Sequence, residues 1–473
     1  MSGSGLAERG EAAEFRSGLH GVAWPAVPDE RGMTLLALQY QFERTERWSA
    51  ADLRRHQFRQ LEALLAHAAA HVPYWRTILP AAGFRAGAPL TEEIWRRIPV
   101  LSRESLQAQG EAMHSRAVPP FHGAVQKTTT SGSTGRPVTV RKTELSLLLF
   151  EAVALREALW HRRDLAGTLA VVYSMGGKVP RDGRRVAHWN PALGATFAGG
   201  PGVVFESTRP APDLARALSR RDPDYLMVYP SLLAELVREA SRQGLPFPSL
   251  AGIITYGEQL SDDVRAAATA QFGVPVTDIY STEEAGYLAL QCPVRPGYHV
   301  QAEAVLLEVL DEGGAPCAPG EAGRVVVTPL HNFAMPLIRY EIGDLAVPGG
   351  ACACGRGLPV LERILGRMRN LLQAPDGSRF WPRLGPLYED LGLPIRQFQV
   401  IQRAPERLEL KLVTARPFAA EEEERARAML RRLCRHDFQV DLSYHDAIPR
   451  GPGGKFEDFI CEVGRPAAEA APR

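Results

Sequence analysis

A run of small hydroxyl and glycine residues in the first third of the chain has the composition of an anion-binding loop. Residues 128–139 are TTTSGSTGRPVT. Glycine lets a backbone approach an anion closely, and hydroxyls add donors. The run follows a strand signal at 124–130 and precedes a helical pattern at 144–163, a setting that suits phosphate oxygens. The same composition fits a flexible polar linker, so the run alone leaves both interpretations open. It is not the Walker loop, because no Lys follows Gly135.

Four later segments place charged side chains beside glycine. They are YSTEEAG at 280–286, RYEIGD at 339–344, GR at 366–367 and PRGPGGKF at 449–456. Carboxylates can hold a hard metal ion, and a flexible lysine can neutralise phosphate. Three of these segments also have an ordinary interpretation. Glu283 suits a solvated helix start, Asp344 suits a turn, and Lys455 suits an exposed surface.

Three cysteines and one histidine form a candidate metal-binding set. Thiolates and imidazole are the donors of tetrahedral zinc sites. The one-residue gap in CACG at 352–355 is tighter than the usual zinc knuckle, and the alternative is four unliganded residues. Paired cysteines in a reducing compartment favour a metal over a disulfide. We therefore expect structural zinc at Cys292, His299, Cys352 and Cys354.

The apolar pattern predicts the elements that must position these residues. Strands at 169–173, 225–229 and 251–256 alternate with helices at 232–242 and 262–272. This alternation predicts parallel α/β layers. Shorter alternating strands joined by DEGG follow, which predicts an antiparallel β-extension over 303–328.

The composition changes after GRMRNLL at 366–372. Strands at 397–413 and 438–444 flank an amphipathic helix at 419–434. The predicted fold class is therefore α/β, with a large N-terminal domain of α/β layers and a β-extension, followed by a small α+β domain. The expected boundaries are 1–33 for a flexible leader, 34–366 for the large domain and 367–473 for the small domain.

Composition excludes several classes of protein. The 473 residues are 45% hydrophobic and 23% charged, and 55 basic against 54 acidic residues leave a net charge of +1. This balance gives no reason to expect nucleic acid or a membrane as a partner. No apolar stretch approaches the about 18 residues of a membrane helix, and the polar N-terminus does not resemble a secretion signal. Six cysteines in so long a chain do not make a disulfide scaffold, so we expect a cytoplasmic location.

Taken in order, the charged and glycine-rich segments resemble the adenylate-forming superfamily of acyl-CoA synthetases, carrier-loading adenylation domains and luciferases. The phenylacetate-CoA ligase branch, with its capsule-locus relatives, is the most similar, and HNFAMPLIRYEIGD at 331–344 and VPYWR at 72–76 are the most characteristic segments. The resemblance covers about residues 34–462. It implies that a carboxylate attacks the α-phosphorus of ATP to give acyl-AMP and pyrophosphate. A nucleophile, usually the thiol of coenzyme A, then displaces AMP.

The resemblance implies roles for the residues that match the family's motifs. Glu283 matches the acidic residue that helps to hold Mg²⁺, Thr282 matches a contact to the α-phosphate, and Tyr280 matches a residue that stacks on adenine. The match to the loop that holds the β- and γ-phosphates is Ser131, Gly132, Ser133, Thr134 and Gly135. The family often has Lys after the proline of this loop. Here Pro137 is followed by Val138, a departure that also occurs in the phenylacetate branch.

Further matches complete the implied nucleotide site. Gly257 and Glu258 match the segment beside adenine, and Asp344 matches the carboxylate that accepts from both ribose hydroxyls. Arg367 matches an arginine near the ribose and phosphate. Lys455 matches the lysine that bridges the carboxylate and the phosphate ester oxygen during adenylation. The implied catalytic residues are Lys455, Thr282 and Glu283.

The resemblance also implies a mobile small domain, which swings between the two half-reactions about a hinge after the Gly-Arg pair. Arg369 and Asn370 stand where the phenylacetate branch often has two Asp, so Arg369 is the expected hinge and the pivot itself stays open. That branch often carries a similar Cys, His and Cys-x-Cys-Gly set. Dimers occur in it, so a homodimer is the expected assembly.

The expected acyl pocket has aromatic walls that suit an aryl or arylacetic acid without selecting one. The candidate walls are Tyr173, Trp189 and Tyr256 first, then Met175, His188, Tyr229 and Tyr287. Three functions stay open. The leading one is a ligase that uses ATP, Mg²⁺ and coenzyme A on a small carboxylic acid. The second is an adenylating enzyme that passes the acyl group to a carrier-protein thiol or an amine. The third is a non-catalytic nucleotide-binding protein.

Overall fold

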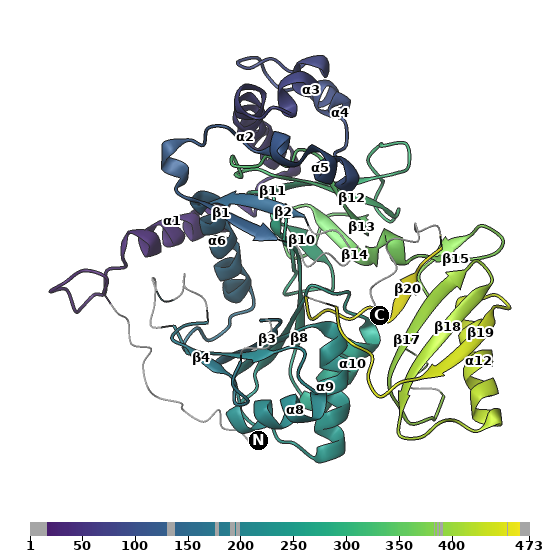
Figure 1. Ribbon diagram of the computed structural model, residues 1–473. Coiled ribbons are helices and arrows are strands. Elements are labelled where there is room, and N and C mark those ends of the chain that lie inside the picture. The colour runs from purple at the N-terminus through teal and green to yellow at the C-terminus, as the bar shows by residue number, and fades with distance from the viewer. Residues whose placement is uncertain are drawn as a thin grey trace.

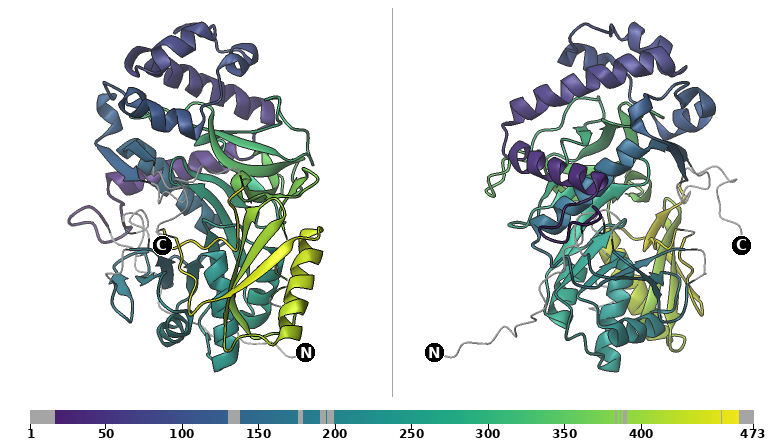
Figure 2. Two further views of the ribbon diagram at one scale, coloured as in Figure 1. Left: turned by 45° about the vertical axis from the view of Figure 1, so that its right-hand side comes forward. Right: turned by 90° about the vertical axis from the view of Figure 1, so that its left-hand side faces the viewer.

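The computed structural model consists of a large and a small half (Figure 1). It describes residues 17–129, 138–175, 179–189, 199–382, 391–451 and 453–463, together with Gly194, Leu384, Gly385 and Leu387. Helices from the N-terminal part gather at one end of the large half, and the C-terminal sheet lies beside the other end (Figures 1 and 2). No helix among these residues is long and apolar enough to span a bilayer.

Side-chain caps start most of the N-terminal helices. Asp29 accepts from the backbone N–H of Gly32, and Thr91 and Ser102 cap two later helices. The first helix begins inside the expected leader because Asp29 provides its cap. These helices are α1 (Glu30–Thr45), α2 (Ala50–His71), α3 (Trp75–Ala81), α4 (Glu92–Arg97) and α5 (Arg103–Gln109).

Five parallel strands lie next to one another in a twelve-stranded sheet, in the order β8-β7-β6-β3-β5. They are β3 (Leu169–Tyr173), β5 (Gly202–Glu206), β6 (Tyr225–Val228), β7 (Gly252–Tyr256) and β8 (Val276–Thr282). The associated helices are α6 (Glu144–Trp160), α8 (Ala211–Arg221), α9 (Pro230–Gln243) and α10 (Asp262–Phe272). Leu232, Leu233 and Leu236 of α9 are fully or almost fully buried. Each such leucine contributes about 1.5–3 kcal/mol by leaving water.

Antiparallel strands extend this sheet beyond β8, which confirms the predicted β-extension. The hairpin that contains DEGG is present, with Leu310 opposite Arg324. The extension comprises β9 (Gly286–Gln291), β10 (Tyr298–Val300), β11 (Val305–Leu310), β12 (Gly323–Pro329), β13 (Tyr340–Gly349) and β14 (Val360–Arg367). β4 (Arg184–Val186) forms the opposite edge, and β1 (Val125–Thr129) and β2 (Thr139–Thr143) form a separate pair.

The small half is an α+β unit with a core of its own, which runs from Leu372 to Cys461. A 3₁₀ turn, η3 (Met368–Asn370), precedes it. Its four-stranded sheet has the order β19-β18-β17-β20. The elements are β15 (Leu372–Gln373), β16 (Arg379–Phe380), β17 (Ile395–Ala404), β18 (Arg407–Thr414), α12 (Ala420–Cys434), β19 (Gln439–Tyr444) and β20 (Phe459–Cys461).

Arg339 joins the N-terminal helices to the sheet from a buried position. Its guanidinium pairs with both carboxylate oxygens of Glu308 at 3.2 Å and donates to the carbonyl oxygen of Ile98 at 2.7 Å and that of Arg96 at 3.1 Å. Arg339 is 3% exposed. The positive charge of Arg339 therefore has almost no contact with water, and its hydrogen-bonding and ion-pair partners within the fold must stabilise it.

We predict that Arg339→Met destabilises the large half by about 3–5 kcal/mol, because Glu308 is left as a buried charge without its partner. Arg55→Met is the matched control, since Arg55 pairs with Asp52 on an exposed face of α2. The control should change the free energy of unfolding by less than about 1 kcal/mol. Urea denaturation followed by tryptophan fluorescence measures both. Equal effects of the two substitutions would contradict the assignment.

Candidate active site

The carboxyl ends of the parallel strands meet at one edge of the large sheet, the position where open α/β sheets bind ligands. Polar and glycine residues follow directly on several of these strands. They are Ser174 after β3, Ser207 after β5, Tyr229 after β6, Gly257 and Glu258 after β7, and Thr282 and Glu283 at the end of β8. The topology therefore brings together four of the predicted site residues, Gly257, Glu258, Thr282 and Glu283, although the two pairs lie about 25 residues apart in the chain.

The loop that carries Lys455 reaches this edge from the small half (Figure 1, yellow segment before β20). The Tyr229 hydroxyl donates to the carbonyl oxygen of Gly453 at 3.1 Å. Arg450 donates to the hydroxyl of Ser231 at 2.7 Å and pairs with Glu235 at 2.6 Å. These polar contacts hold the loop against the N-terminal part of α9.

Glu258 is shared between the two halves. Its carboxylate accepts the backbone N–H of Ser231 at 2.9 Å and that of Phe456 at 2.7 Å. Burial raises the pKa of Glu258, although these donors and Arg450 act in the opposite direction. In this arrangement the residue predicted to lie beside adenine also fixes the backbone next to Lys455.

Lys455 lies among the other predicted site residues. Burial and the charge of Arg367 hold the pKa of Lys455 below its usual range, while Glu258, Glu283 and Asp344 oppose that shift. Gly257 has φ +74°, and a Cβ there would lie 3.1 Å from Cε and 3.3 Å from Nζ of Lys455. The glycine therefore allows both a left-handed turn and the close approach of the lysine.

Asp344 is held between two partners. The Tyr280 hydroxyl donates to its Oδ2 at 2.8 Å, and Arg367 Nε lies 3.0 Å from its Oδ1. Asp344 on β13 and Arg367 on β14 are opposite each other in the ladder. Tyr280 is buried, and burial together with Asp344 raises its pKa well above the usual range, so it stays a neutral donor. The bond between Tyr280 and Asp344 has no signal in the sequence, because it joins residues from two separate motifs.

The two adjacent glutamates after Thr282 have different environments. Glu284 is buried and pairs with Arg103 at 3.1 Å, whereas Glu283 is exposed at the site. Thr282 Oγ1 accepts the backbone N–H of Ala285 at 3.1 Å. Of the two carboxylates, Glu283 is the more exposed, and its expected role as a ligand of a hard cation such as Mg²⁺ stays a prediction.

The predicted phosphate loop, Ser131 to Gly135, lies outside the described residues. The strands on either side of it, β1 and β2, pair antiparallel with Thr129 opposite Thr139. Strand β2 therefore separates the loop from α6, whereas the sequence suggested a loop that leads into the helix. Arg369, the expected hinge, lies in η3, and its side chain is outside the described set.

A cavity lies between α6 and the segment that follows β8. Phe150 and Tyr287 line it and stack with ring centroids 4.5 Å apart. Trp189 lines an adjoining hollow together with the same two rings. Tyr173 and Tyr256 line neither of these two hollows. Tyr256 instead packs 4.7 Å from the Tyr229 ring and donates to the carbonyl oxygen of Val172 at 3.0 Å.

Phe150 is a cavity residue that the sequence analysis missed. Its signal was an aromatic residue in the apolar run ELSLLLFEAV, on the first helix after the small-residue loop. An apolar helix of this kind equally suits the core, so the sequence alone does not separate the two roles.

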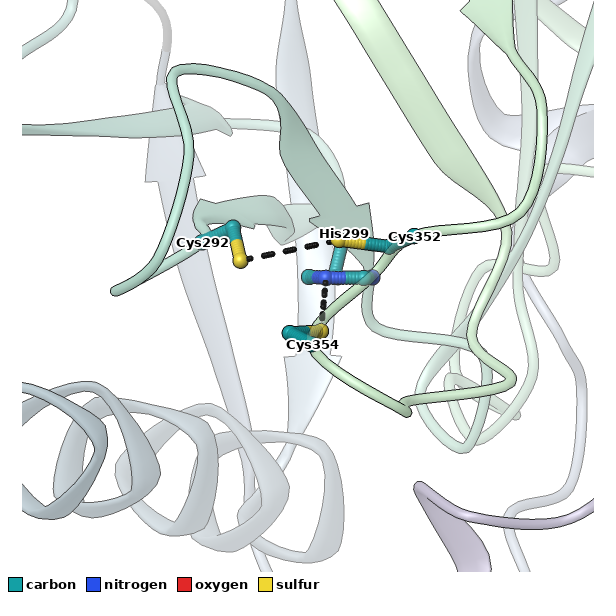
Figure 3. Close-up of side chains that lie close together, drawn as sticks. All are labelled: Cys292, His299, Cys352 and Cys354. Carbon is teal, nitrogen blue, oxygen red and sulfur yellow. Dashed lines mark hydrogen bonds between the residues drawn. The ribbon is translucent and has the colours of Figure 1, made fainter.

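The four predicted zinc ligands converge (Figure 3). Their ligand atoms all lie within 4.8 Å of one another. Cys292 Sγ is 3.8 Å from Cys352 Sγ, and Cys354 Sγ is 3.2 Å from His299 Nε2. The residues come from the end of β9, from β10 and from the loop after β13. The donor set and its compactness fit a tetrahedral metal site.

Comparison with known proteins is consistent with this geometry. Phenylacetate-coenzyme A ligase from Thermus thermophilus is 25% identical over 441 residues, covering 86% of this chain and 96% of that protein. The Escherichia coli phenylacetate-coenzyme A ligase is 26% identical over 340 residues, covering 68% of this chain and 73% of that protein.

Solved structures confirm the predicted fold class. A 2-hydroxyisobutyryl-CoA ligase in the postadenylation state, in complex with R3-HIB-AMP, superposes with a TM-score of 0.69 at 19% identity and covers 89% of this chain and 92% of its own. The same ligase in the thioesterification state with 2-HIB-AMP and CoA gives 0.56 at 20% identity, covering 86% and 90%.

Two family models match the chain in succession. Residues 383–462 match the CapK C-terminal domain, in the small half. Residues 91–334, more than half of the chain, match the model described as AMP-binding enzyme. The chain belongs to the family of AMP-binding enzymes.

Proposed function

We propose that this chain is an AMP-forming carboxylate–CoA ligase. It activates a carboxylic acid with ATP to acyl-AMP and pyrophosphate, then transfers the acyl group to the thiol of coenzyme A. The observation that carries the proposal is the meeting of Lys455 from the small half with Glu258, Glu283, Asp344 and Arg367 at the sheet edge. Bringing a carboxylate to a triphosphate requires cations and donors where the negative charges meet. The names of the phenylacetate-coenzyme A ligases support this activity.

Each residue has a role in this proposal. Lys455 holds the attacking carboxylate beside the phosphate ester oxygen, as a mobile point charge can. Glu283 supplies a hard oxygen ligand for Mg²⁺, which would neutralise phosphate charge when bound. Asp344 accepts from the ribose hydroxyls beside Tyr280 and Arg367, and Thr282 contacts the α-phosphate. Gly257 and Glu258 border the adenine, and the loop from Ser131 to Gly135 holds the outer phosphates.

The small half moves as a unit in this proposal. It has its own core, and the short turn η3, which includes Arg369, connects it to the large sheet. We place the boundary in that turn, next to the expected division between 34–366 and 367–473, because Arg367 still pairs with Asp344 in the large sheet. The similarity to the postadenylation structure exceeds that to the thioesterification structure, with TM-scores of 0.69 and 0.56.

Lys455→Ala should reduce adenylation by a factor of about 10²–10³, the usual effect of removing one electrostatic contact to the transition state. Thioester formation from synthetic acyl-AMP should change far less, because the new carboxylate–phosphate bond already exists. Lys411→Ala, at a lysine on β18 of the same half, is the matched control. ATP–pyrophosphate exchange and acyl-CoA formation measure the two steps separately. An equal loss in both steps would contradict the role of Lys455.

One set of assays tests both the substrate and the acceptor. ATP–pyrophosphate exchange is measured with aryl, arylacetic and fatty acids, first without coenzyme A and then with it. We expect exchange with an aryl or arylacetic acid and AMP release that depends on coenzyme A. Exchange without turnover of coenzyme A would favour a carrier-protein thiol or an amine as the acceptor. No exchange with any acid, and wild-type behaviour of Lys455→Ala in nucleotide binding, would favour a non-catalytic nucleotide-binding protein.

We also propose that Cys292, His299, Cys352 and Cys354 bind a structural zinc ion. The compact set of three sulfurs and one nitrogen supports this proposal. A bound ion would join the loop after β13 to β9 and β10, away from the lysine loop.

Protein purified without chelators should contain about one zinc ion per chain by elemental analysis, as a four-ligand structural site predicts. Cys354→Ser should lose most of this zinc and melt at a lower temperature, since zinc stabilises only the folded state. Cys317→Ser, at a cysteine outside the cluster, should keep both properties. A wild-type protein that neither contains zinc nor melts higher when zinc is added would exclude the site.

A further inference from the structure

Part of the lining of the cavity between α6 and the segment after β8 is apolar. The stacked rings of Phe150 and Tyr287 form part of it, with ring planes 21° apart. Leu147, Leu149 and Val153 of α6 add aliphatic surface. A flat aromatic ring gains most from such a surface, because offset stacking adds to the burial of area.

The lining of the same cavity also includes polar residues. It contains Lys142 from β2, Glu284, His331 and Asn332. Glu284 already pairs with Arg103 at 3.1 Å. The Asn332 amide donates to the carbonyl oxygens of Arg141 and Met335, at 2.9 and 3.2 Å, and its oxygen accepts from Ala334. Glu284 and Asn332 therefore already have hydrogen-bonding partners within the protein.

Lys142 and His331 can each form a further hydrogen bond that the described residues do not provide. Among the described residues, no ion pair or side-chain hydrogen bond ends at the Lys142 ammonium. Burial lowers the pKa of Lys142 below its usual range, while the charges of Glu283 and Glu284 oppose that shift. Nδ1 of His331 is buried and has no partner among the described residues. Burial and His122 lower the pKa of His331 to about 4, so the ring is neutral at pH 7.

A half-buried cation without a partner is costly unless a ligand completes its environment. The cavity also adjoins the reaction site, because Glu284, Ala285 and Gly286 line it and directly follow Glu283. Phe150 and Tyr287 line both this cavity and the adjoining hollow, so a ring that lies against them is close to Lys142 and to the reacting groups.

We propose that Lys142, with His331 beside it, binds an oxygen substituent on the ring of the acid, so that the preferred substrates are aryl or arylacetic acids with a second carboxylate or a hydroxyl group. This inference rests on the proposed function and assigns its substrate class. Lys142 is then the specificity-determining residue. An ammonium recognises such an oxygen by a charge-assisted hydrogen bond, which is stronger than a bond between neutral groups.

A competing role for Lys142 is contact with the phosphates of ATP, since Val138 stands where related loops often have a lysine. The two roles give different kinetics. A phosphate contact raises the KM for ATP by the same factor with every acid. A contact with the substituent changes only the ratio between acids that differ in that substituent.

The test uses matched acids in the ATP–pyrophosphate exchange assay with the full chain. The pairs are phenylacetate against 4-hydroxyphenylacetate and 4-carboxyphenylacetate, and benzoate against 4-hydroxybenzoate and terephthalate. We expect kcat/KM at least tenfold higher for an oxygen-bearing acid than for its plain partner. Lys142→Met should reduce this ratio at least tenfold, and Lys142→Arg should largely keep it, because the charge remains.

Lys127→Met is the matched control, at an exposed lysine on the neighbouring strand β1 that lines neither cavity. It should leave the ratio unchanged. If Lys142→Met melts at a lower temperature than the wild type, Lys142→Gln provides a second neutral variant. A wild-type ratio near one, or a ratio that the neutral variants do not alter, overturns the inference. A uniform rise in the KM for ATP assigns Lys142 to the phosphates and overturns it as well.

Failure of the proposed function has a different signature. In that case no acid supports exchange, and calorimetric titration of 4-carboxyphenylacetate and phenylacetate decides the inference by binding alone. Tighter binding of 4-carboxyphenylacetate by the wild type, lost in the neutral variants, supports the inference. Equal affinities for the two acids overturn it.

Discussion

The half-buried carboxylate of Glu258 connects the two halves of the molecule and positions the lysine on which the proposed chemistry depends. It accepts one N–H from the first turn of α9 and one from Phe456, the residue after Lys455. A carboxylate removed from water needs such donors, because an unpaired buried charge is strongly destabilising. The small half thus satisfies a charge that belongs to the large half. If the small half moves as proposed, Glu258 loses the backbone N–H of Phe456 and can be hydrated again.

Close backbone approach is the second constraint at this interface. Gly454 has φ +76°, and a Cβ there would lie 2.1 Å from the hydroxyl oxygen of Ser207. Gly257 faces Lys455 from the other side and also has a positive φ. Only glycine relieves both the steric contact and the backbone strain at such positions. The glycines at this interface therefore allow the lysine loop to pack closely against the edge of the sheet. This steric role is separate from any flexibility that they give the loop.

Local periodicity made much of the fold predictable. Helix α10 begins and ends where the sequence indicated, and the parallel strands β3, β6 and β7 fall within a residue or so of their predicted limits. Motif order likewise indicated which residues would gather at the sheet edge. The contact between Tyr280 and Asp344 and the cavity formed by Lys142 with Glu284 were not predictable. They join residues far apart in the chain, and such pairings are set by the register of the sheet, which residue types alone do not specify. Tyr173 and Tyr256 line neither of the two hollows described, and aromatic character alone does not separate pocket walls from core residues.

The way the two halves contact each other argues that their arrangement can change. Among the residues that the structure describes, the apolar core of the small half, from Leu372 to Cys461, shares no residue with the large core clusters. Most of the hydrogen bonds described between the halves involve the lysine loop: Tyr229 with Gly453, Arg450 with Ser231 and Glu235, and Glu258 with Phe456. One more joins Arg238 of α9 to the carbonyl oxygen of Arg396 on β17. Each such bond has a net worth of about 0.5–1.5 kcal/mol, and somewhat more where a charge takes part. Their sum is of the order of the few kcal/mol that separate interconverting conformations of a protein. A ligand that binds one arrangement better than the other can therefore shift the balance, and a two-step reaction that needs Lys455 in only its first step can use that shift.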